Sequence, residues 1–356
     1  MKLPKQIKKI MVVKLRTLGD ILTTFPLVRR LKQVYPKAYL IMVADDHYKE
    51  LLENNPYIDQ FWPHPANQLK EQDILPGLWQ QITTMAAIRR EKIDLFIDLY
   101  GSLRTALWGK VSGAPLCMGF NLRGRKYFYT HRIKAAYRYV VDLNLQFIET
   151  LGYAPQDNSL EFFITSEDEE KAKNYLQKHR VQPDKPYIVV SPGGGWELKR
   201  WSAPNFGLVA KKLSLKNECK ILISGNKQEE DIVKLCAKQA GLESIPVIDL
   251  PLRQLAVIIK GSKLFLGNDS GPKYIAEAFK VPTVICYGPT DYINNIPPKP
   301  EFCHTVATNK VHCQPCNLLT CPQTRPYCLA DLTVEQVLEL AMKVYKKETK
   351  VLLKLK

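Results

Sequence analysis

A strand–turn–helix pattern at residues 264–279 contains the residue types that bind an anion. Asp269 and Ser270 occupy the positions of a helix N-cap, and Gly271 and Pro272 suit the first turn of the helix that follows. A strand that enters a helix through small residues directs free backbone N–H groups at one point. The pattern therefore predicts a diphosphate site, although helix capping alone would also explain Asp269 and Ser270.

The sequence SPGGGWELKRW, residues 191–201, predicts a second phosphate-binding loop after a strand. Its three consecutive glycines are Gly193, Gly194 and Gly195. Glycines let the backbone approach a phosphate closely, but no Lys-Ser or Lys-Thr pair follows at the spacing of a Walker A motif. Lys199 is a compact point charge suited to a diphosphate leaving group, with Arg200 as its helper. A solvated surface position is the commoner fate of a lysine and is the alternative for Lys199.

Gly19 and Asp20 follow the first predicted strand, residues 8–14. Ligands of open α/β sheets bind at the carboxyl ends of the strands, so we expect Asp20 to face a ligand. We also expect Asp20 to be the N-cap of the next helix, which the apolar spacing predicts to continue to Tyr35, and this role is compatible with facing a ligand.

Two further groups of residues are candidates for substrate contacts. Ser224 and Gly225 close another predicted strand, and Glu229 opens the helix after it, where an acidic residue often only complements the helix dipole. Residues 100–132 are rich in basic side chains, which either grip phosphates or form a solvated face. The candidates among them are Arg104, Arg123, Arg125, Lys126 and Arg132.

Strands and helices alternate along the chain, which predicts an α/β fold with mostly parallel sheets. The segment 151–168 predicts a hinge, because it holds a glycine, a proline and a polar cluster, after which the alternation restarts. Ser166 and Glu169 fit a capping box for the next helix. We therefore predict two Rossmann-like domains that face one cleft, residues 1–165 and 166–356.

Four motifs together resemble glycosyltransferase family 9, the ADP-heptose:lipopolysaccharide heptosyltransferases. They are D-S-G-P-x-x-I-A-x-A followed by V-P-T-V-x-x-x-G-P-T, K-L-R-x-L-G-D-x-L-x-T-x-P, a Lys before a Trp in the glycine loop, and D-x-x-G-S-L-R. The resemblance extends from Lys14 to the last predicted helix. One departure is Tyr274, at a position where the family usually has a histidine.

The resemblance implies the GT-B architecture and transfer of heptose from ADP-heptose to the lipopolysaccharide inner core, with inversion. Asp20 would be the catalytic base and Lys199 would stabilise departing ADP, with no metal and no cofactor, while Lys273 and Tyr274 would share the role of the family histidine. The donor would bind the C-terminal domain, at Gly193, Gly194, Gly195, Lys199, Arg200, Ser224, Gly225, Glu229, Leu250, Asp269, Ser270, Gly271, Lys273 and Tyr274. The acceptor would bind the N-terminal domain, at Gly19, Asp20, Arg104, Arg123, Arg125 and Lys126.

Four of the nine cysteines form a C-x2-C-x4-C-x6-C pattern before the last predicted helix. They are Cys313, Cys316, Cys321 and Cys328. Four thiols so close in sequence could bind Zn²⁺, but the spacing is not that of a paired C-x2-C site. We interpret the cluster as structural, with its metal content left open.

The chain has 51 Lys and Arg against 35 Asp and Glu, a net charge of +16. No helix-turn-helix or RNA-binding pattern occurs, and anionic lipid or a phosphorylated glycolipid fits this charge as well as nucleic acid does, so we predict no nucleic-acid partner. No apolar run reaches the roughly 18 residues that span a bilayer, and the N-terminus lacks a signal cleavage site. The C-terminal KVYKKETKVLLKLK suits a membrane-surface helix or a solvated one. We predict a cytoplasmic protein, peripheral on the inner membrane.

Two alternatives stay open at this point. The chain could use another nucleotide sugar, or it could be a degenerate homologue that binds a nucleotide or glycolipid without catalysis. Tyr274 keeps the second alternative open, whereas the presence of both Asp20 and Lys199 argues against it. The acceptor position and the oligomeric state do not follow from the sequence.

Overall fold

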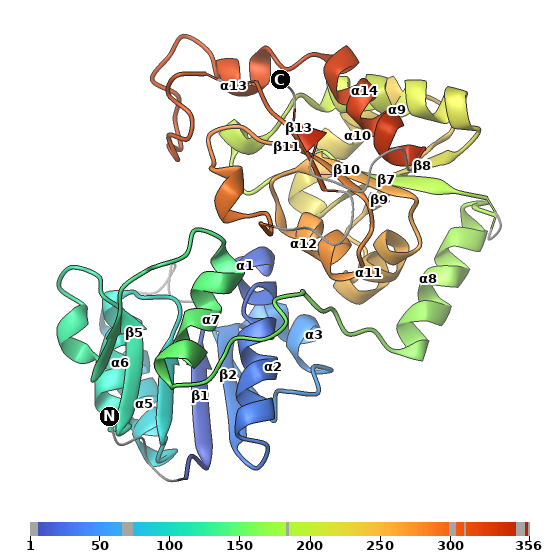
Figure 1. The fold of residues 1–356 in the computed structure, drawn as a ribbon. Helices are drawn as coiled ribbons and strands as arrows, with labels where there is room; N and C mark the ends of the chain where they lie inside the picture. Colours follow the sequence, from blue (N-terminus) through green and yellow to red (C-terminus); the bar gives the residue numbers. More distant parts are fainter. Residues whose placement is uncertain are drawn as a thin grey trace. The chain divides into compact units, whose positions relative to one another are not determined.

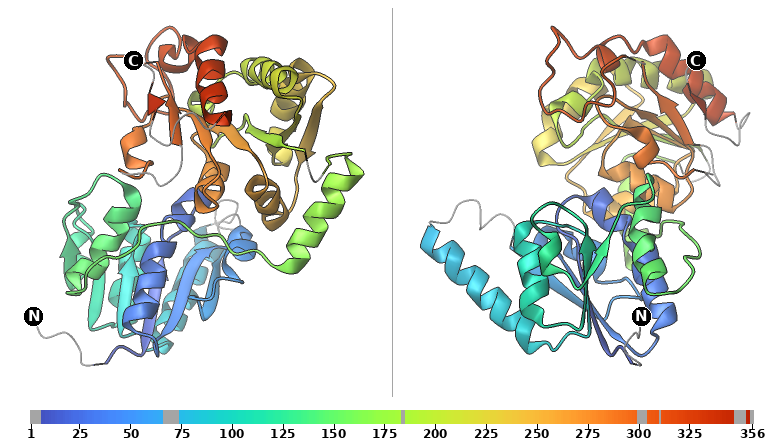
Figure 2. Two further views of the ribbon diagram at one scale, coloured as in Figure 1. Left: turned by 45° about the vertical axis from the view of Figure 1, so that its right-hand side comes forward. Right: turned by 60° about the vertical axis from the view of Figure 1, so that its left-hand side comes forward.

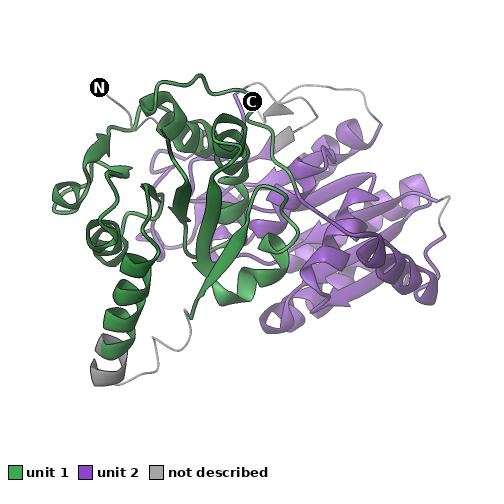
Figure 3. Ribbon diagram, turned by 90° about the horizontal axis from the view of Figure 1, so that it is seen from below, with its two compact units in different colours: residues 1–161 green, residues 162–356 purple. Residues whose placement is uncertain are grey.

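The computed structural model describes residues 6–65, 74–182, 185–298, 304–309, 311–346 and the backbone of 353–354. The chain divides into two compact units, residues 1–161 and 162–356, which Figure 3 shows in green and purple. Each unit is a parallel α/β sheet with helices on its faces.

The sheet of the N-terminal unit has six parallel strands in the order β3-β2-β1-β4-β5-β6. The central strand β1 has the sequence KIMVV, and its last four residues are buried, as a strand covered on both faces requires. The strands are β1 (Lys9–Val13), β2 (Tyr39–Asp45), β3 (Gln60–His64), β4 (Leu95–Asp98), β5 (Leu116–Phe120) and β6 (His131–Ile133).

Two pairs of helices cover this sheet. Helix α2 packs against α7, and α5 packs against α6. Figure 2 shows the two pairs on opposite faces of the sheet. Met11 and Val13 of β1 pack in one core with Trp108 of α6. The helical segments are α1 (Leu18–Leu22), α2 (Phe25–Val34), η1 (Asp46–Tyr48), α3 (Lys49–Leu52), α5 (Ile74–Arg90), α6 (Leu103–Ser112), η2 (Lys126–Phe128) and α7 (Val140–Thr150).

The sheet of the C-terminal unit has the order β13-β12-β11-β10-β7-β8-β9, again with parallel neighbours. Its first strand along the chain, β7, lies between β8 and β10, so the strand order reverses there. Ligands of open α/β sheets bind at such a reversal. The strands are β7 (Tyr187–Ser191), β8 (Lys220–Gly225), β9 (Ser244–Ile248), β10 (Leu264–Asn268), β11 (Thr283–Cys286), β12 (His304–Ala307) and β13 (Leu353–Lys354).

The helices of this unit also form two groups, as Figure 1 shows. Helix α9 packs against α10 and α14, whereas α11 packs against α8 and α12. The helical segments are α8 (Ser166–Lys178), η3 (Glu197–Lys199), α9 (Ala203–Asn217), η4 (Lys227–Glu229), α10 (Glu230–Ala240), α11 (Leu252–Lys260), α12 (Gly271–Ala278), η5 (Tyr292–Asn294), α13 (Tyr327–Ala330) and α14 (Val334–Tyr345).

The structure corrects two local predictions. The helix expected to continue from Asp20 to Tyr35 is interrupted between α1 and α2, where Thr23 and Thr24 donate their hydroxyls to backbone carbonyls of the preceding turn and Pro26 lacks an N–H. The capping box of α8 pairs Thr165 with Asp168, not Ser166 with Glu169.

No helix within the described ranges is both long and apolar enough to cross a membrane. Of the predicted C-terminal surface helix, residues 343–356, the structure describes the end of α14 and Leu353–Lys354, and these last two residues form strand β13 instead of a helix.

Candidate functional site

Asn268, the last residue of β10, holds the glycine-rich loop in place. Its side chain is fully buried. Its Oδ1 accepts the N–H of Trp201 at 2.9 Å, and its Nδ2 donates to the carbonyls of Pro192 at 2.8 Å and Gly193 at 3.1 Å. One amide therefore fixes both ends of the loop against the turn that begins α12.

Glu229 and Arg200 fix the middle of the same loop. The N–H of Gly194 donates to Glu229 Oε1 at 2.9 Å, and Arg200 donates from Nε and an NH2 group to the carbonyl of Gly194 at 3.0 and 2.8 Å. A Cβ at Gly193 would lie 2.1 Å from Glu229 Oε1, so any larger residue there would displace this carboxylate from its place beside the loop. The structure thus uses Glu229 and Arg200, both predicted donor contacts, to shape the loop.

Lys199 forms an ion pair with Asp269 across the two predicted phosphate loops. The distance from Nζ to Asp269 Oδ2 is 3.1 Å, and the two side chains are 17% and 3% exposed. The ammonium also lies 4.5 Å from the centre of the Trp196 ring. Asp269 Oδ2 further accepts the hydroxyl of Thr290 at 2.8 Å. Lys199 is therefore not a freely solvated lysine, because its charge is held at one point beside the start of α12.

The start of α12 keeps polar groups available. Ser270 is the N-cap residue, yet its side chain makes no capping hydrogen bond. Its buried Oγ has no hydrogen-bond partner among the described residues. Neither Ser270 nor Asp269 therefore acts as a simple helix cap. The Ser270 hydroxyl and the Gly271 N–H remain suited to an anion, since Pro272 supplies no N–H.

Lys273 and Tyr274 are turned into the protein. Lys273 is fully buried, and its Nζ donates to the carbonyl of Asn295 at 2.7 Å and pairs with Glu277 at 3.3 Å. The Tyr274 ring lies 3.9 Å from this ammonium, and its hydroxyl donates to Asn295 Oδ1 at 3.2 Å. Lys273 has no exposed surface with which to contact the donor directly. Its ammonium instead lies in the interior beneath the turn that begins α12.

Glu277 is the acidic partner inside this buried network. Burial raises its pKa to about 7, against the opposing effect of the Lys273 charge. Asn295 Nδ2 lies 3.4 Å from Asp269 Oδ2, so the buried pair is connected to the Lys199–Asp269 pair through a single residue. The turn that begins α12 therefore rests on a fixed polar network.

Asp20 lies in the first turn of α1, and the cap is Thr17 rather than Asp20 itself. The Thr17 hydroxyl accepts the N–H of Asp20 at 3.2 Å and donates to Asp20 Oδ2 at 2.7 Å. Lys14 Nζ lies 3.6 Å from Asp20 Oδ1, and the Asp20 side chain is 43% exposed. The carboxylate is thus oriented on one side and open to solvent on the other, as a general base requires.

The turn that leads to Asp20 is strained. Arg16 and Thr17 have φ values of 63° and 44°, a region that residues other than glycine rarely adopt. Such strain occurs often at functional sites. The guanidinium of Arg16 lies over the Tyr100 ring at 5.8 Å. The strained turn therefore carries a basic side chain that packs on Tyr100, two residues after β4.

Arg104 lies within the N-terminal unit with its guanidinium 5.7 Å from the centre of the Trp108 ring. Burial lowers the pKa of Arg104, and it lowers the pKa of nearby His64 to about 4, which leaves His64 neutral. His64 Nε2 has no hydrogen-bond partner within the part of the chain that the structure describes. Asp45, which is buried, has a pKa raised by burial and lowered in part by Arg16. Asp45 and His64 are the last residues of β2 and β3, whereas Arg104 lies in the first turn of α6.

The other predicted contacts divide into exposed and structural residues. Arg123 is exposed, whereas Arg125 and Lys126 are half-buried in the connection between β5 and β6. Ser224 is buried and donates to the carbonyl of Val190 at 3.5 Å. A Cβ at Gly225 would lie 2.6 Å from a methyl carbon of Val233, so this glycine lets helix α10 pack closely. Leu250 is half-buried and lies just before α11.

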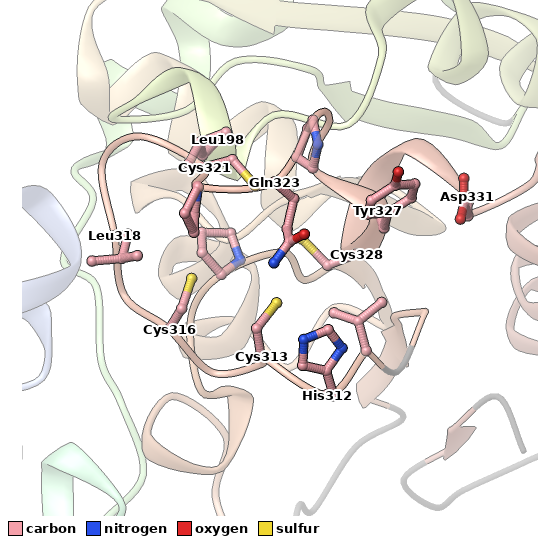
Figure 4. Close-up of a pocket in the computed structure, with 14 residues that line it drawn as sticks. Leu198, His312, Cys313, Cys316, Leu318, Cys321, Gln323, Tyr327, Cys328 and Asp331 are labelled. Carbon is pink, nitrogen blue, oxygen red and sulfur yellow. The ribbon is translucent and has the colours of Figure 1, made fainter.

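The four clustered cysteines line one cavity of about 450 Å³, together with His312, Tyr327 and apolar side chains. Figure 4 shows their side chains around this space. All four are free thiols and half-buried. Within the described residues, no three or more His, Cys, Asp or Glu side chains are grouped so that they could hold a metal ion. In this structure the cysteines are walls of a cavity.

Several residues that build the site did not emerge from the sequence. Asn268 offered a signal, since it is a polar residue at the end of an apolar strand. Thr17 offered another, because a threonine three residues before Asp20 fits a capping pattern. Thr290 and Asn295 offered none, because they reach the site only through the fold of the segment after β11.

Comparison with known proteins identifies the family. The family model for glycosyltransferase family 9 (heptosyltransferase) matches residues 83–325. The chain belongs to this family. It is therefore a glycosyltransferase. Among its relatives, the lipopolysaccharide heptosyltransferase 1 of Campylobacter coli is 25% identical over 309 residues, which cover 81% of this chain and 86% of that protein.

Two solved structures extend the likeness to the fold. A glycosyl transferase of family 9 from Veillonella parvula matches with a TM-score of 0.79 and 22% identity, over 98% of this chain and 99% of that one. The E. coli ADP-heptose lipopolysaccharide heptosyltransferase II matches with a TM-score of 0.72 and 20% identity, over 96% and 99%. Both likenesses cover nearly the whole chain and confirm the predicted GT-B fold of two Rossmann-like domains.

Proposed function

We propose that this family 9 enzyme transfers a heptose from ADP-heptose to a sugar hydroxyl of the lipopolysaccharide inner core, with inversion at the anomeric carbon. The single observation that carries the proposal is the Lys199–Asp269 pair, which holds a cation at the residue before Ser270, whose hydroxyl has no hydrogen-bond partner among the described residues. The names of the relatives, which are lipopolysaccharide heptosyltransferases, support this donor and acceptor.

On the donor side, Lys199 and the start of α12 would bind the diphosphate. When the bond between the anomeric carbon and the phosphate oxygen breaks, negative charge grows on departing ADP. The Lys199 ammonium, the Ser270 hydroxyl and the Gly271 N–H are preorganised donors for that charge, which is where such groups accelerate a reaction most. This arrangement supplies the electrostatic role that a metal ion has in other transferases, so we propose no metal and no cofactor.

On the acceptor side, Asp20 would take the proton from the attacking sugar hydroxyl as the new glycosidic bond forms. Its carboxylate is held by Thr17 and Lys14, which fixes its orientation. Attack from the face opposite to departing ADP inverts the configuration. The basic residues of the N-terminal unit, Arg104 among them, would bind anionic groups of the acceptor. We propose that the enzyme is cytoplasmic and works as a peripheral protein at the inner membrane.

Nucleotide selectivity tests the donor assignment. Calorimetric titration with ADP, UDP and GDP is expected to give the tightest binding with ADP, and Lys199→Met is expected to weaken it. Tighter binding of UDP or GDP would favour a transferase with another nucleotide sugar.

The degenerate alternative needs a separate experiment, because a binding protein would also retain ADP affinity. We expect release of ADP from ADP-heptose in the presence of inner-core acceptor. Tight ADP binding without turnover of any nucleotide sugar, together with turnover in Tyr274→His, would establish a catalytically degenerate protein instead.

A further inference from the structure

One segment of the N-terminal unit has a single sign of charge. Residues 99–141 contain no Asp and no Glu. The same segment contains eight basic residues: Arg104, Lys110, Arg123, Arg125, Lys126, Arg132, Lys134 and Arg138. Because no carboxylate lies between them in the sequence, this segment presents a positive field to any partner.

Helix α6, within this segment, exposes leucines where a soluble helix normally exposes polar residues. Leu103 is 60% exposed and Leu107 is 37% exposed, although both belong to a regular helix. Lys110 follows three residues later and is also exposed. The spacing i, i+4, i+7 places these three side chains on one face of the helix.

The connection between β5 and β6 extends this face. Leu122 is 39% exposed, and its Cδ1 would lie 3.0 Å from a Cβ at Gly101, which places it beside the start of α6. Segment η2 packs against α6 and carries Tyr127, which is 69% exposed. The ammonium of Lys126 and the guanidinium of Arg132 lie 5.2 and 5.7 Å from the centre of the Tyr127 ring. Apolar and basic groups are therefore interleaved.

We propose that this surface docks the enzyme on an anionic bilayer. We call it the α6 face, and it consists of Leu103, Leu107, Lys110, Leu122, Tyr127 and Arg132. Leucines buried at the acyl boundary, a tyrosine at the headgroup level and cations paired with lipid phosphates are the elements of interfacial binding. The inference deepens the proposed function and rests on it for the choice of partner, because a lipid-linked acceptor is presented at such a surface.

A bilayer fits the α6 face better than nucleic acid does. Nucleic-acid surfaces are mostly polar and use aromatic rings as platforms for bases. Here three of the six side chains are leucines, which have no flat face to offer a base. An anionic lipid surface satisfies the charge and the exposed apolar groups together.

Cosedimentation with vesicles tests the proposal on the full chain, without donor or glycolipid. We use vesicles of equal parts phosphatidylcholine and phosphatidylglycerol, and vesicles of phosphatidylcholine alone. Wild type is expected to bind the anionic vesicles more tightly, with binding that falls as salt rises. Leu103→Glu/Leu107→Glu is expected to lower the partition at least about tenfold, and Lys110→Ser/Arg132→Ser roughly tenfold to thirtyfold.

Matched controls come from helix α9 of the other unit. Leu215 is 72% exposed there, and Lys211 is exposed on the same helix. Leu215→Glu and Lys211→Ser are expected to leave the partition unchanged. Thermal unfolding and ADP affinity of every variant are measured in parallel, so a folding defect is recognised.

Three results would overturn the proposal. The first is equal binding of wild type to both kinds of vesicle. The second is unchanged vesicle binding in both α6 variants. If Leu352→Glu/Leu355→Glu abolishes vesicle binding at the same time, the C-terminal tail is the docking segment instead. The third is tighter binding to single-stranded RNA than to vesicles, lost in the same variants, which would make the α6 face a nucleic-acid site. Because the vesicle assay contains neither donor nor acceptor, its result does not test the proposed transfer reaction. A failure of the transfer assay likewise does not change the vesicle result.

Discussion

Lys199→Met removes the cation of the donor site and keeps the side-chain stem. In the structure this cation is fixed by Asp269 at 3.1 Å and by the Trp196 ring at 4.5 Å. A hydrogen bond from a charged group to a ligand contributes about 1.5–3 kcal/mol, so we expect ADP affinity to fall roughly 10- to 150-fold. Transfer should slow further, because the charge on departing ADP exceeds that of the bound donor.

The same change should also lower stability. Asp269 would keep the hydroxyl of Thr290 at 2.8 Å but lose its ammonium, at a cost of about 1–3 kcal/mol for a buried carboxylate. Isothermal titration with ADP and urea denaturation measure the two effects, with Lys211→Met at an exposed position of helix α9 as control. A variant that binds ADP within about twofold of wild type, at unchanged stability, would refute both the ion pair and its phosphate role.

Three further predictions follow from the described contacts. Asp20→Asn should lower the transfer rate by about 10²–10⁴ at unchanged ADP affinity, since a positioned base contributes that much; a rate within about tenfold of wild type would exclude this base. Glu277 has a folded-state pKa of about 7 against 4.5, so wild type binds this proton more tightly when folded and loses stability as pH rises between those values. Glu277→Gln should remove this pH dependence, whose slope is at most about 1.4 kcal/mol per pH unit. Denaturant unfolding of both proteins at several pH values measures the slope, and an equal slope in wild type and variant would contradict the assignment. Cys313→Ser/Cys316→Ser should lower the melting temperature more than the specific activity of the folded fraction, and normal melting with no metal by elemental analysis would show that the loop is neither a staple nor a metal site.

Most of the fold could be predicted, because buried parallel strands leave a strong sequence pattern. Runs such as KIMVV and KILISG are apolar, short and followed by turns, which is the pattern of a sheet covered on both faces. The break between α1 and α2 was missed, because helical periodicity continues through Thr23 and Thr24 while their hydroxyls compete for backbone carbonyls.

The site could be predicted as a location but not as a set of contacts. The glycine loop, Lys199 and Asp269 meet, and their motifs are adjacent in the sheet because β7 and β10 are neighbours. Lys273 was expected at the ligand because it neighbours Tyr274, which occupies the position of the family histidine. Its helical phase turns it inward, toward Glu277 four residues later, and that i, i+4 pair was the overlooked signal.

Residues supplied by distant segments could not be predicted at all. Asn295 connects the two ion pairs of the donor unit, yet it lies in a segment after β11 with no motif of its own. Glu229 was predicted as a donor contact, and the structure shows that its carboxylate accepts the N–H of Gly194, 35 residues earlier. Contacts of this kind depend on how loops fold over a sheet edge, which local pattern does not specify.

The most direct test of the central claim is the mass of the acceptor after reaction. Purified enzyme is incubated with an inner-core glycolipid and a mixture of ADP-heptose, a UDP-sugar and a GDP-sugar, and the glycolipid is analysed by mass spectrometry. We expect addition of one heptose with wild type and with Lys211→Met, and strongly reduced addition with Asp20→Asn and with Lys199→Met. Addition of a hexose, or an unchanged glycolipid with wild type, would contradict this expectation.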